Sequence, residues 1–117
     1  MRKRKPHNTL AARHPAARLL RDLGEEPAVA SVFVSLLITG PATAAELERR
    51  TGYAYSGLGP ALRELQGRRW IKATEKASPK RGRNPFQYEA AASKAKLERD
   101  LRSRLKERMG PLTSLLG

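Results

Sequence analysis

Glycine and proline divide the middle of this chain into short segments, and this division limits the folds open to it. Gly24, the pair Gly40-Pro41, Gly52 and Gly67 separate groups of apolar residues that recur at helical spacing. Glycine often ends a helix, and proline cannot continue one. Each segment therefore predicts a short helix, which is stable only if its apolar face packs against its neighbours.

Two helices are expected in the first third of the chain. Residues 15–23 combine apolar residues at helical spacing with Arg18 and Arg21 on the opposite side, which predicts an amphipathic helix. Pro27 suits the first position of a second helix. The apolar residues of that helix are Val29, Val32, Phe33, Leu36 and Leu37. Because they surround most of its circumference, this helix should lie at the centre of the fold.

Residues 43–66 predict two helices joined by a tight turn. Thr43 and Glu46 have the spacing of a capping box, and Gly52 is expected to end the first helix. Ser56 is the expected N-cap of the second helix. The inward-facing residues of the second helix are Leu58, Ala61, Leu62 and Leu65. Two short helices with a glycine in the turn make a helix-turn-helix.

The remaining elements are a hairpin and a long helix. Residues 70–74 and 86–88 have the composition and alternation of strands, and the loop between them is basic. Residues 90–109 contain no glycine or proline and place one apolar stripe along a helix. Gly110-Pro111 is expected to end that helix. The predicted fold class is mainly α with a small β-hairpin.

The charge of the chain favours a polyanionic partner. There are 24 Lys and Arg against 11 Asp and Glu, which gives a net charge of +13. Residues 24–66 carry a net charge of −2, whereas residues 1–23, 67–89 and 90–117 carry +6, +5 and +4. The near-neutral segment is therefore expected to form the core, and the others the cationic surface. Nucleic acid is the leading partner and an anionic membrane surface the second.

Catalytic, metal-binding and membrane-spanning roles are not expected. The chain has no cysteine, and His7 and His14 have no acidic cluster at metal-ligand spacing. No phosphate-binding glycine loop or nucleophile elbow is present, so neither an enzyme nor a cofactor is predicted. The apolar residues 28–38 reach about half of the roughly 20 residues that a transmembrane helix needs. Charged residues follow the basic start where a signal peptide is apolar, so the predicted location is the cytoplasm, in association with the nucleoid.

The order of these elements resembles a winged helix-turn-helix with N-terminal and C-terminal helical extensions. The resemblance is carried by residues 43–65, by residues 62–71, where Leu-Arg-Glu-Leu leads into Arg-Arg-Trp-Ile, and by Arg-Gly-Arg-Asn-Pro-Phe-Gln-Tyr at residues 81–88. Similar runs occur in prokaryotic regulators of the TrmB, PadR and MarR/ArsR types, and the match covers residues 27–109. It implies a small homodimeric transcriptional regulator that binds double-stranded DNA with a recognition helix in the major groove and a basic wing on the backbone or in the minor groove.

Four parts of the chain are expected. They are a disordered basic arm at residues 1–14, the winged helix-turn-helix domain at residues 15–89, a dimerisation helix at residues 90–109 and a tail at residues 110–117. The cations of the arm are Arg2, Lys3, Arg4 and Lys5. They are expected to add a flexible contact to phosphate or to the minor groove, and a nuclear-localisation signal is the alternative.

The resemblance also assigns DNA contacts. On the recognition helix they are Tyr53, Tyr55, Ser56, Gly57 and Arg63. On the wing they are Lys76, Lys80, Arg81 and Arg83. The tyrosines and the serine would lie near phosphate at the helix N-terminus, where backbone N–H groups favour an anion. The alternatives are that one tyrosine packs inward, that Arg63 pairs with a surface carboxylate and that the wing is a solvated loop.

The last helix is expected to form the dimer interface. Its stripe consists of Leu97, Leu101, Leu105 and Met109, while Arg99, Arg102 and Lys106 stay outside it. The alternative is that the stripe packs within the monomer on the helix that contains Phe33. No small-molecule effector is evident, and a ligand pocket would have to lie in the dimer interface.

A less specific function is the main alternative. The expected recognition helix exposes Gly57, Gly59 and Pro60, so only Arg63 and Gln66 are suited to bidentate base contacts. This would fit an architectural, nucleoid-type protein with a weak sequence preference. RNA binding is a third possibility, although no aromatic stacking platform is evident. Binding of the last helix to a membrane surface is disfavoured by its lack of Trp and Phe.

Overall fold

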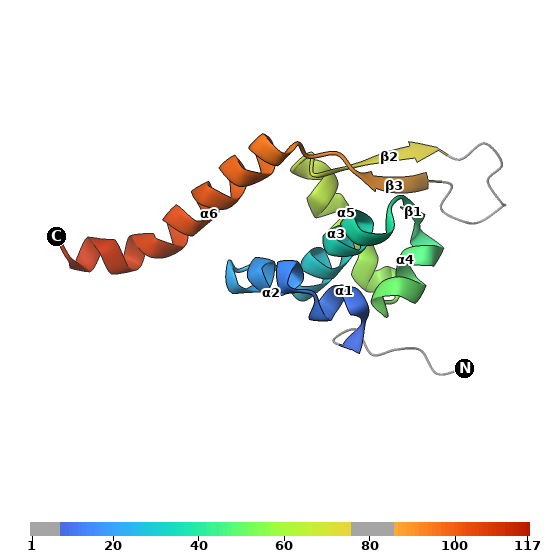
Figure 1. Cartoon of the computed structure of the whole chain (residues 1–117), viewed down its shortest axis with the longest axis horizontal. Helices are drawn as coiled ribbons and strands as arrows, with labels where there is room; N and C mark the ends of the chain where they lie inside the picture. Colours follow the sequence, from blue (N-terminus) through green and yellow to red (C-terminus); the bar gives the residue numbers. More distant parts are fainter. Residues whose placement is uncertain (1–7, 76–85) are drawn as a thin grey trace.

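The computed structural model describes residues 8–75 and 86–117. Its elements in chain order are α1 (Leu10–Arg13), α2 (Pro15–Asp22), α3 (Pro27–Thr39), β1 (Ala42–Thr43), α4 (Ala44–Thr51), α5 (Tyr55–Gly67), β2 (Ile71–Glu75), β3 (Phe86–Ala90) and α6 (Lys94–Leu115). Helices dominate, and the three strands form one antiparallel sheet in the order β1-β3-β2 (Figure 1). The prediction of a mainly helical fold with a hairpin is confirmed.

Helix α3 forms the centre of the fold, as its apolar circumference predicts. It packs against α1, α2, α4, α5 and β3. Its large buried side chains are Val29, Val32, Phe33, Val34 and Leu36. The ring of Phe33 lies 5.1 Å from that of Trp70, which is fully buried. Leu37 departs from the prediction, because it lies on the side of α3 that faces solvent.

The predicted cap of α4 is confirmed, and the predicted cap of α5 is wrong. The Thr43 hydroxyl accepts the Glu46 N–H at 3.2 Å, while the Glu46 carboxylate accepts the Thr43 N–H at 3.1 Å. Helix α5 begins one residue before Ser56, with Ala54 at the N-cap and no side-chain bond from it. Instead the Glu48 carboxylate accepts the Tyr55 N–H at 2.8 Å, so α4 supplies the cap of α5.

The sheet contains one strand more than the sequence predicts. Strands β2 and β3 pair antiparallel, with Ile71 opposite Ala90 and Glu75 opposite Phe86. The two-residue β1 adds a second antiparallel partner to β3, with Ala42 opposite Tyr88. A strand of this length has no alternation that a sequence pattern can reveal. It joins the end of α3 to the sheet and places α4 beside β3.

The predicted boundary of the N-terminal arm at residue 14 is wrong. The Thr9 hydroxyl accepts the Ala12 N–H at 3.2 Å and caps α1, and Ala11 and Ala12 are buried. These small side chains allow α1 to lie close against α3 and α4. The part of the arm that carries Arg2, Lys3, Arg4 and Lys5 lies outside the described residues.

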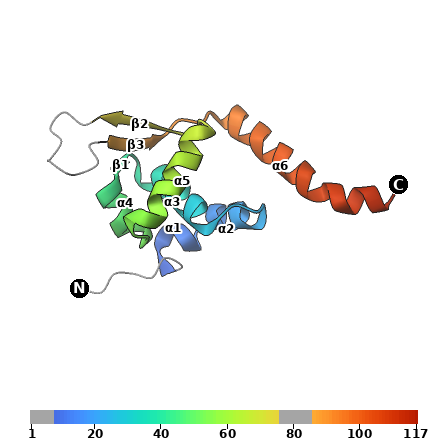
Figure 2. The same cartoon turned by 180° about the vertical axis from the view of Figure 1, so that it is seen from behind.

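The predicted bounds of the last helix are also wrong at both ends. Ala90 belongs to β3, and Ser93 caps α6 by accepting the Lys96 N–H at 3.1 Å. Helix α6 then continues through Gly110 and Pro111 to Leu115. Proline removes one helical hydrogen bond, but no described neighbour packs on this exposed turn to oppose the resulting bend. Both views show α6 running away from the rest of the fold (Figures 1 and 2).

Candidate nucleic-acid interface

Helix α5 has one side in the core and one side in solvent. Leu58, Ala61, Leu62 and Leu65 are buried, as the apolar stripe predicts. An α-helix turns by about 100° per residue, so Ser56, Gly59 and Arg63 fall on the side away from these buried residues. Ser56 and Arg63 are exposed. The sequence pattern therefore identified the solvent side of α5 correctly.

Arg63 lies along this solvent side. A Cβ atom at Gly59 would come within 3.4 Å of Arg63 Nη1, so the guanidinium folds back over the glycine. Within residues 8–75 and 86–117, no carboxylate pairs with Arg63. The alternative in which Arg63 pairs with a surface carboxylate is therefore not seen among the described residues. Its charge is available to an anion.

The two tyrosines before and at the start of α5 separate. Tyr53 packs against the hydrophobic core, and burial raises the pKa of its hydroxyl, an effect that the positive charge of Arg21 partly offsets. Tyr55 is exposed at the first position of α5. Of the two tyrosines, only Tyr55 is exposed, next to Ser56 at the helix N-terminus, which matches the alternative in which one tyrosine packs inward.

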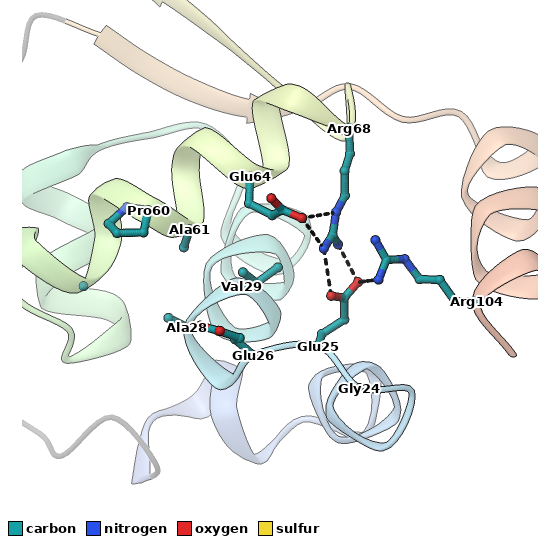
Figure 3. A pocket seen from close by; sticks show the side chains of 11 residues that line it. Gly24, Glu25, Glu26, Ala28, Val29, Pro60, Ala61, Glu64, Arg68 and Arg104 are labelled. Carbon is teal, nitrogen blue, oxygen red and sulfur yellow. Dashed lines mark hydrogen bonds and ion pairs between the residues drawn. The ribbon is translucent and has the colours of Figure 1, made fainter. Parts of the chain in front are cut away.

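Gly57 lies on a different side of α5 from Arg63. A Cβ atom there would sit 3.5 Å from the Tyr53 ring. Gly57 also lines an open pocket of about 410 Å³, together with Pro60, Ala61 and Glu64 of the same helix. The pocket lies between α5, the start of α3 and α6, and Figure 3 shows these residues around it. The structure therefore brings Gly57 together with Tyr53 and separates it from Arg63.

A charged cluster at the edge of this pocket joins three parts of the fold. Glu25 lies between α2 and α3, and only 3% of its side chain is exposed. Arg68, which caps the C-terminus of α5, donates to both carboxylate oxygens of Glu25 and to Glu64 (Figure 3). Arg104 of α6 lies 3.3 Å from Glu25 Oε2. We call Glu25, Glu64, Arg68 and Arg104 the Glu25 cluster.

The surroundings of Arg68 favour its charged form. Burial alone would lower the pKa of Arg68, but hydrogen bonds to Glu25 and Glu64 and the charges of these carboxylates raise it overall. The guanidinium carbon of Arg68 also lies 5.2 Å from the Trp70 ring centroid, within the range of a cation–π contact. Arg68 is thus held from several directions at the junction of α5 and β2.

A second polar contact attaches α6 beside the Glu25 cluster. The indole N–H of Trp70 donates to Asp100 Oδ2 at 2.8 Å, and Lys96 lies 3.0 Å from the same oxygen. The hydrogen bond from Trp70 and the bond and charge of Lys96 lower the pKa of Asp100. Farther along α6, the guanidinium of Arg108 lies close to Gly24. A Cβ atom added at Gly24 would be 2.7 Å from Arg108 Nη1.

Sequence reasoning missed the Glu25 cluster and the Trp70 contact. In the sequence, Glu25 precedes the expected start of a helix, where negative charge is ordinarily favourable, so nothing marks it as a buried partner. The available signal was a row of α6 residues at intervals of four, beside the predicted apolar stripe. The row consists of Lys96, Asp100, Arg104 and Arg108. Residues four apart share one helix face, so this row predicts a second contact surface.

The predicted apolar stripe of α6 divides into two halves. Leu97 and Leu101 are half-buried and pack against the core of the same chain. Leu105 and Met109 are each 46% exposed, and Leu112 is 63% exposed. The monomer therefore covers the first half of the stripe and leaves the second half in solvent.

The wing residues Lys76, Lys80, Arg81 and Arg83 lie outside the described residues. In the part that the structure describes, no helix is long and apolar enough to cross a membrane. No group of three or more metal-ligating His, Asp or Glu side chains comes together among those residues either. A scan against protein-family models finds no matching family, and a search of curated proteins finds no similar sequence.

Proposed function

We propose that this chain is a winged helix-turn-helix protein that binds double-stranded DNA as a homodimer and regulates transcription. The observation that carries the proposal is the solvent side of α5. There Arg63 has no carboxylate partner among the described residues and lies over Gly59. Small residues at positions 56 and 59 would let the helix approach DNA closely, with Arg63 directed to a base edge or phosphate.

The order of elements supports the proposal. A helix, a short strand, two helices joined by a tight turn and an antiparallel hairpin follow one another from α3 to β3. This is the order of the winged helix-turn-helix proteins that the sequence resembles. In that arrangement α5 is the recognition helix, and the loop between β2 and β3 is the wing.

The charge of the chain also supports the proposal. A net charge of +13 on 117 residues would attract a polyanion at long range. Within α5 the acidic Glu64 is neutralised by Arg68, at 2.6 Å from its Nη2 atom. The solvent side of α5 is therefore positively charged, because it carries Arg63 and the carboxylate of Glu64 is already paired.

The homodimer rests on the second half of the α6 stripe. Leu105, Met109 and Leu112 form an apolar row on an isolated helix, with basic side chains beside it. Two such helices can pack antiparallel across a twofold axis, which buries the same residues on both copies. Self-association covers the row and leaves the flanking cations at the rim, where water and salt screen their mutual repulsion.

A specific observation favours an architectural role as the second candidate. Apart from Arg63, only Gln66 on the solvent side of α5 has a side chain suited to bidentate base contact. One good base contact adds about 1 to 3 kcal/mol of discrimination. Phosphate contacts and DNA shape would then supply most of the binding, as in proteins that coat duplex DNA.

The test is a fluorescence-anisotropy titration at two salt concentrations. The probes are a duplex from the upstream region of the chain's own gene, an unrelated duplex of equal length and a single strand. Preference for the upstream duplex by about 10³ would support an autoregulating factor. Equal and steeply salt-dependent binding to both duplexes would favour the architectural role. Binding to neither duplex would exclude the DNA-binding proposal.

Arg63→Ala tests whether α5 is the binding helix. It should weaken duplex binding and lower the salt slope by about one if it removes one phosphate contact. Arg102→Ala is the matched control, because it removes an exposed arginine from α6. Equal losses for the two variants would mean that only total charge matters and that α5 is not the recognition helix.

A further inference from the structure

The Glu25 cluster connects the two helices that the proposed function needs most. Arg68 and Glu64 belong to α5 or its C-cap, and Arg104 belongs to α6. Glu25 receives both arginines on one nearly buried carboxylate. Any change in the angle between α5 and α6 must therefore move Arg104 away from Glu25 or displace Glu25 itself.

The rest of α6 is held to the body by few contacts. None of its residues is buried, and its apolar attachment consists of the half-buried Leu97 and Leu101. The polar attachments are Asp100 to Trp70, Arg104 to Glu25 and the approach of Arg108 to Gly24. A 22-residue helix is about 33 Å long at 1.5 Å per residue, so a small rotation at this joint moves its far end by several ångströms.

We infer that Glu25 and Arg104 are positioning residues that fix the angle between α5 and α6, and thereby the spacing of the DNA half-sites that a dimer accepts. The inference about spacing rests on the proposed function. In a dimer joined through the outer half of α6, the separation of the two α5 helices depends on this angle. Half-sites for such helices lie about one helical turn apart, near 34 Å, so a shift of a few ångströms corresponds to about one base pair.

A buried ion pair suits this role for a physical reason. Apolar packing of Leu97 and Leu101 tolerates small rotations of the helix, because dispersion contacts are non-directional. The guanidinium of Arg68 binds both oxygens of Glu25 in a fixed planar geometry, and Arg104 lies 3.3 Å from Oε2, which Arg68 also binds. Because the side chain of Glu25 is only 3% exposed, its ion pairs favour one orientation of α6 among those that the apolar contact allows.

The angle between α5 and α6 can be tested on the protein without DNA. The chain has no cysteine, so Gln66→Cys on α5 and Ser114→Cys on α6 allow two spin labels to be placed at exposed positions. Dilution with excess unlabelled chain isolates the distance within one protomer in a double electron–electron resonance experiment. The original chain should give one narrow distance distribution, and Arg104→Gln should broaden it at least twofold.

Arg102→Gln is the control, since it removes the same charge from the outer face of the same helix. It should leave the distance distribution unchanged. Arg104→Gln removes only the α6 side of the cluster and keeps Arg68 on Glu25, so the core is expected to fold. An equally narrow distribution for Arg104→Gln and the original chain would overturn the inference, because the apolar contacts alone would then fix α6.

The spacing is tested on DNA without labels. A site selected from random duplexes supplies two half-sites, whose separation is then changed by one and two base pairs. The original chain should prefer one separation by about tenfold or more, and Arg104→Gln should reduce that preference severalfold while Arg102→Gln keeps it. An unchanged preference in Arg104→Gln would overturn the role in spacing. If the original chain binds no duplex, the proposed function fails, and the resonance experiment still decides whether Glu25 and Arg104 fix the angle.

Discussion

The indole N–H of Trp70 donates to the carboxylate of Asp100 at 2.8 Å and links the core to α6. Trp70 is fully buried just before β2, and Asp100 lies on the second turn of α6, a helix in which no residue is buried. The only tryptophan of the chain therefore sits at the joint between body and helix. Its fluorescence reports on that joint without any added label.

This contact predicts a pH dependence of stability. The bonds from Trp70 and Lys96 lower the pKa of Asp100 in the folded state. A carboxyl group whose pKa is lowered by folding contributes stability above its unfolded value, about 3.9, and loses that contribution as pH falls through the folded value. The free energy of unfolding of the original chain should thus exceed that of Asp100→Asn at pH 6, and the gap should close below about pH 4.

Urea denaturation followed by Trp70 fluorescence measures this gap between pH 6 and pH 2.5. Glu98→Gln is the control, because it removes an exposed carboxylate from the same helix. A gap between the original chain and Asp100→Asn that stays constant down to pH 2.5 would contradict the assignment.

The buried carboxylate of Glu25 predicts a non-additive pair of substitutions. Arg68→Met leaves this carboxylate with Arg104 as its remaining partner, and breaking a buried ion pair costs about 3 kcal/mol or more. Glu25→Gln combined with Arg68→Met should cost less than Arg68→Met alone, because the buried group that Arg68→Met leaves with only the partly exposed Arg104 is then uncharged. Chemical denaturation of the single and double variants checks this. Costs that simply add would show that the two residues do not interact.

The sequence predicted those features that depend on neighbours in the chain. The capping box joins Thr43 and Glu46, which are three positions apart, and the apolar circumference of α3 follows from its own composition. The solvent side of α5 followed from the same periodicity, because its buried stripe leaves Ser56 and Arg63 outside.

The features that the sequence did not predict depend on distant residues or on weak local rules. Glu25 and Arg68 are 43 positions apart, and nothing near Glu25 distinguishes it from a solvated carboxylate. Pro111 was expected to end the last helix, yet an exposed helix can bend to accommodate a proline. Strand β1 exists only because β3 lies beside it.

The contact between Gly59 and Arg63 predicts a loss of binding that does not come from a loss of folding. Gly59→Ala should change the stability of α5 by less than about 1 kcal/mol, because the gain of alanine over glycine in a helix is offset by Pro60, which disfavours the helical conformation of an alanine before it. The added Cβ atom would lie 3.4 Å from Arg63 Nη1 and on the side proposed to face DNA, so duplex affinity should fall severalfold. Thermal unfolding and anisotropy titration measure the two effects.

Gly110→Ala is the matched control for this experiment. Gly110 also lies within a helix, and a Cβ atom there would meet nothing within 4 Å. Gly110 also precedes a proline, so this variant should show the same small change in stability but no loss of duplex affinity. If Gly59→Ala binds duplex DNA as tightly as Gly110→Ala does, the side of α5 that carries Gly59 is not the DNA-binding side.

The outer half of the α6 stripe predicts which residues would hold the proposed dimer. Leu105→Glu with Met109→Glu should give a monomer with nearly the original stability, because both side chains are 46% exposed in the single chain.

Leu37→Glu is the control, since it also replaces an exposed leucine, on α3, and should leave a dimer. Sedimentation velocity distinguishes the species. A dimer that persists in the α6 variant would place the interface elsewhere, whereas a monomer that still binds a single half-site with reduced affinity would separate dimerisation from DNA contact. Leu101 is unsuitable for this test, because its side chain packs on the core and a charge there would destabilise the monomer itself.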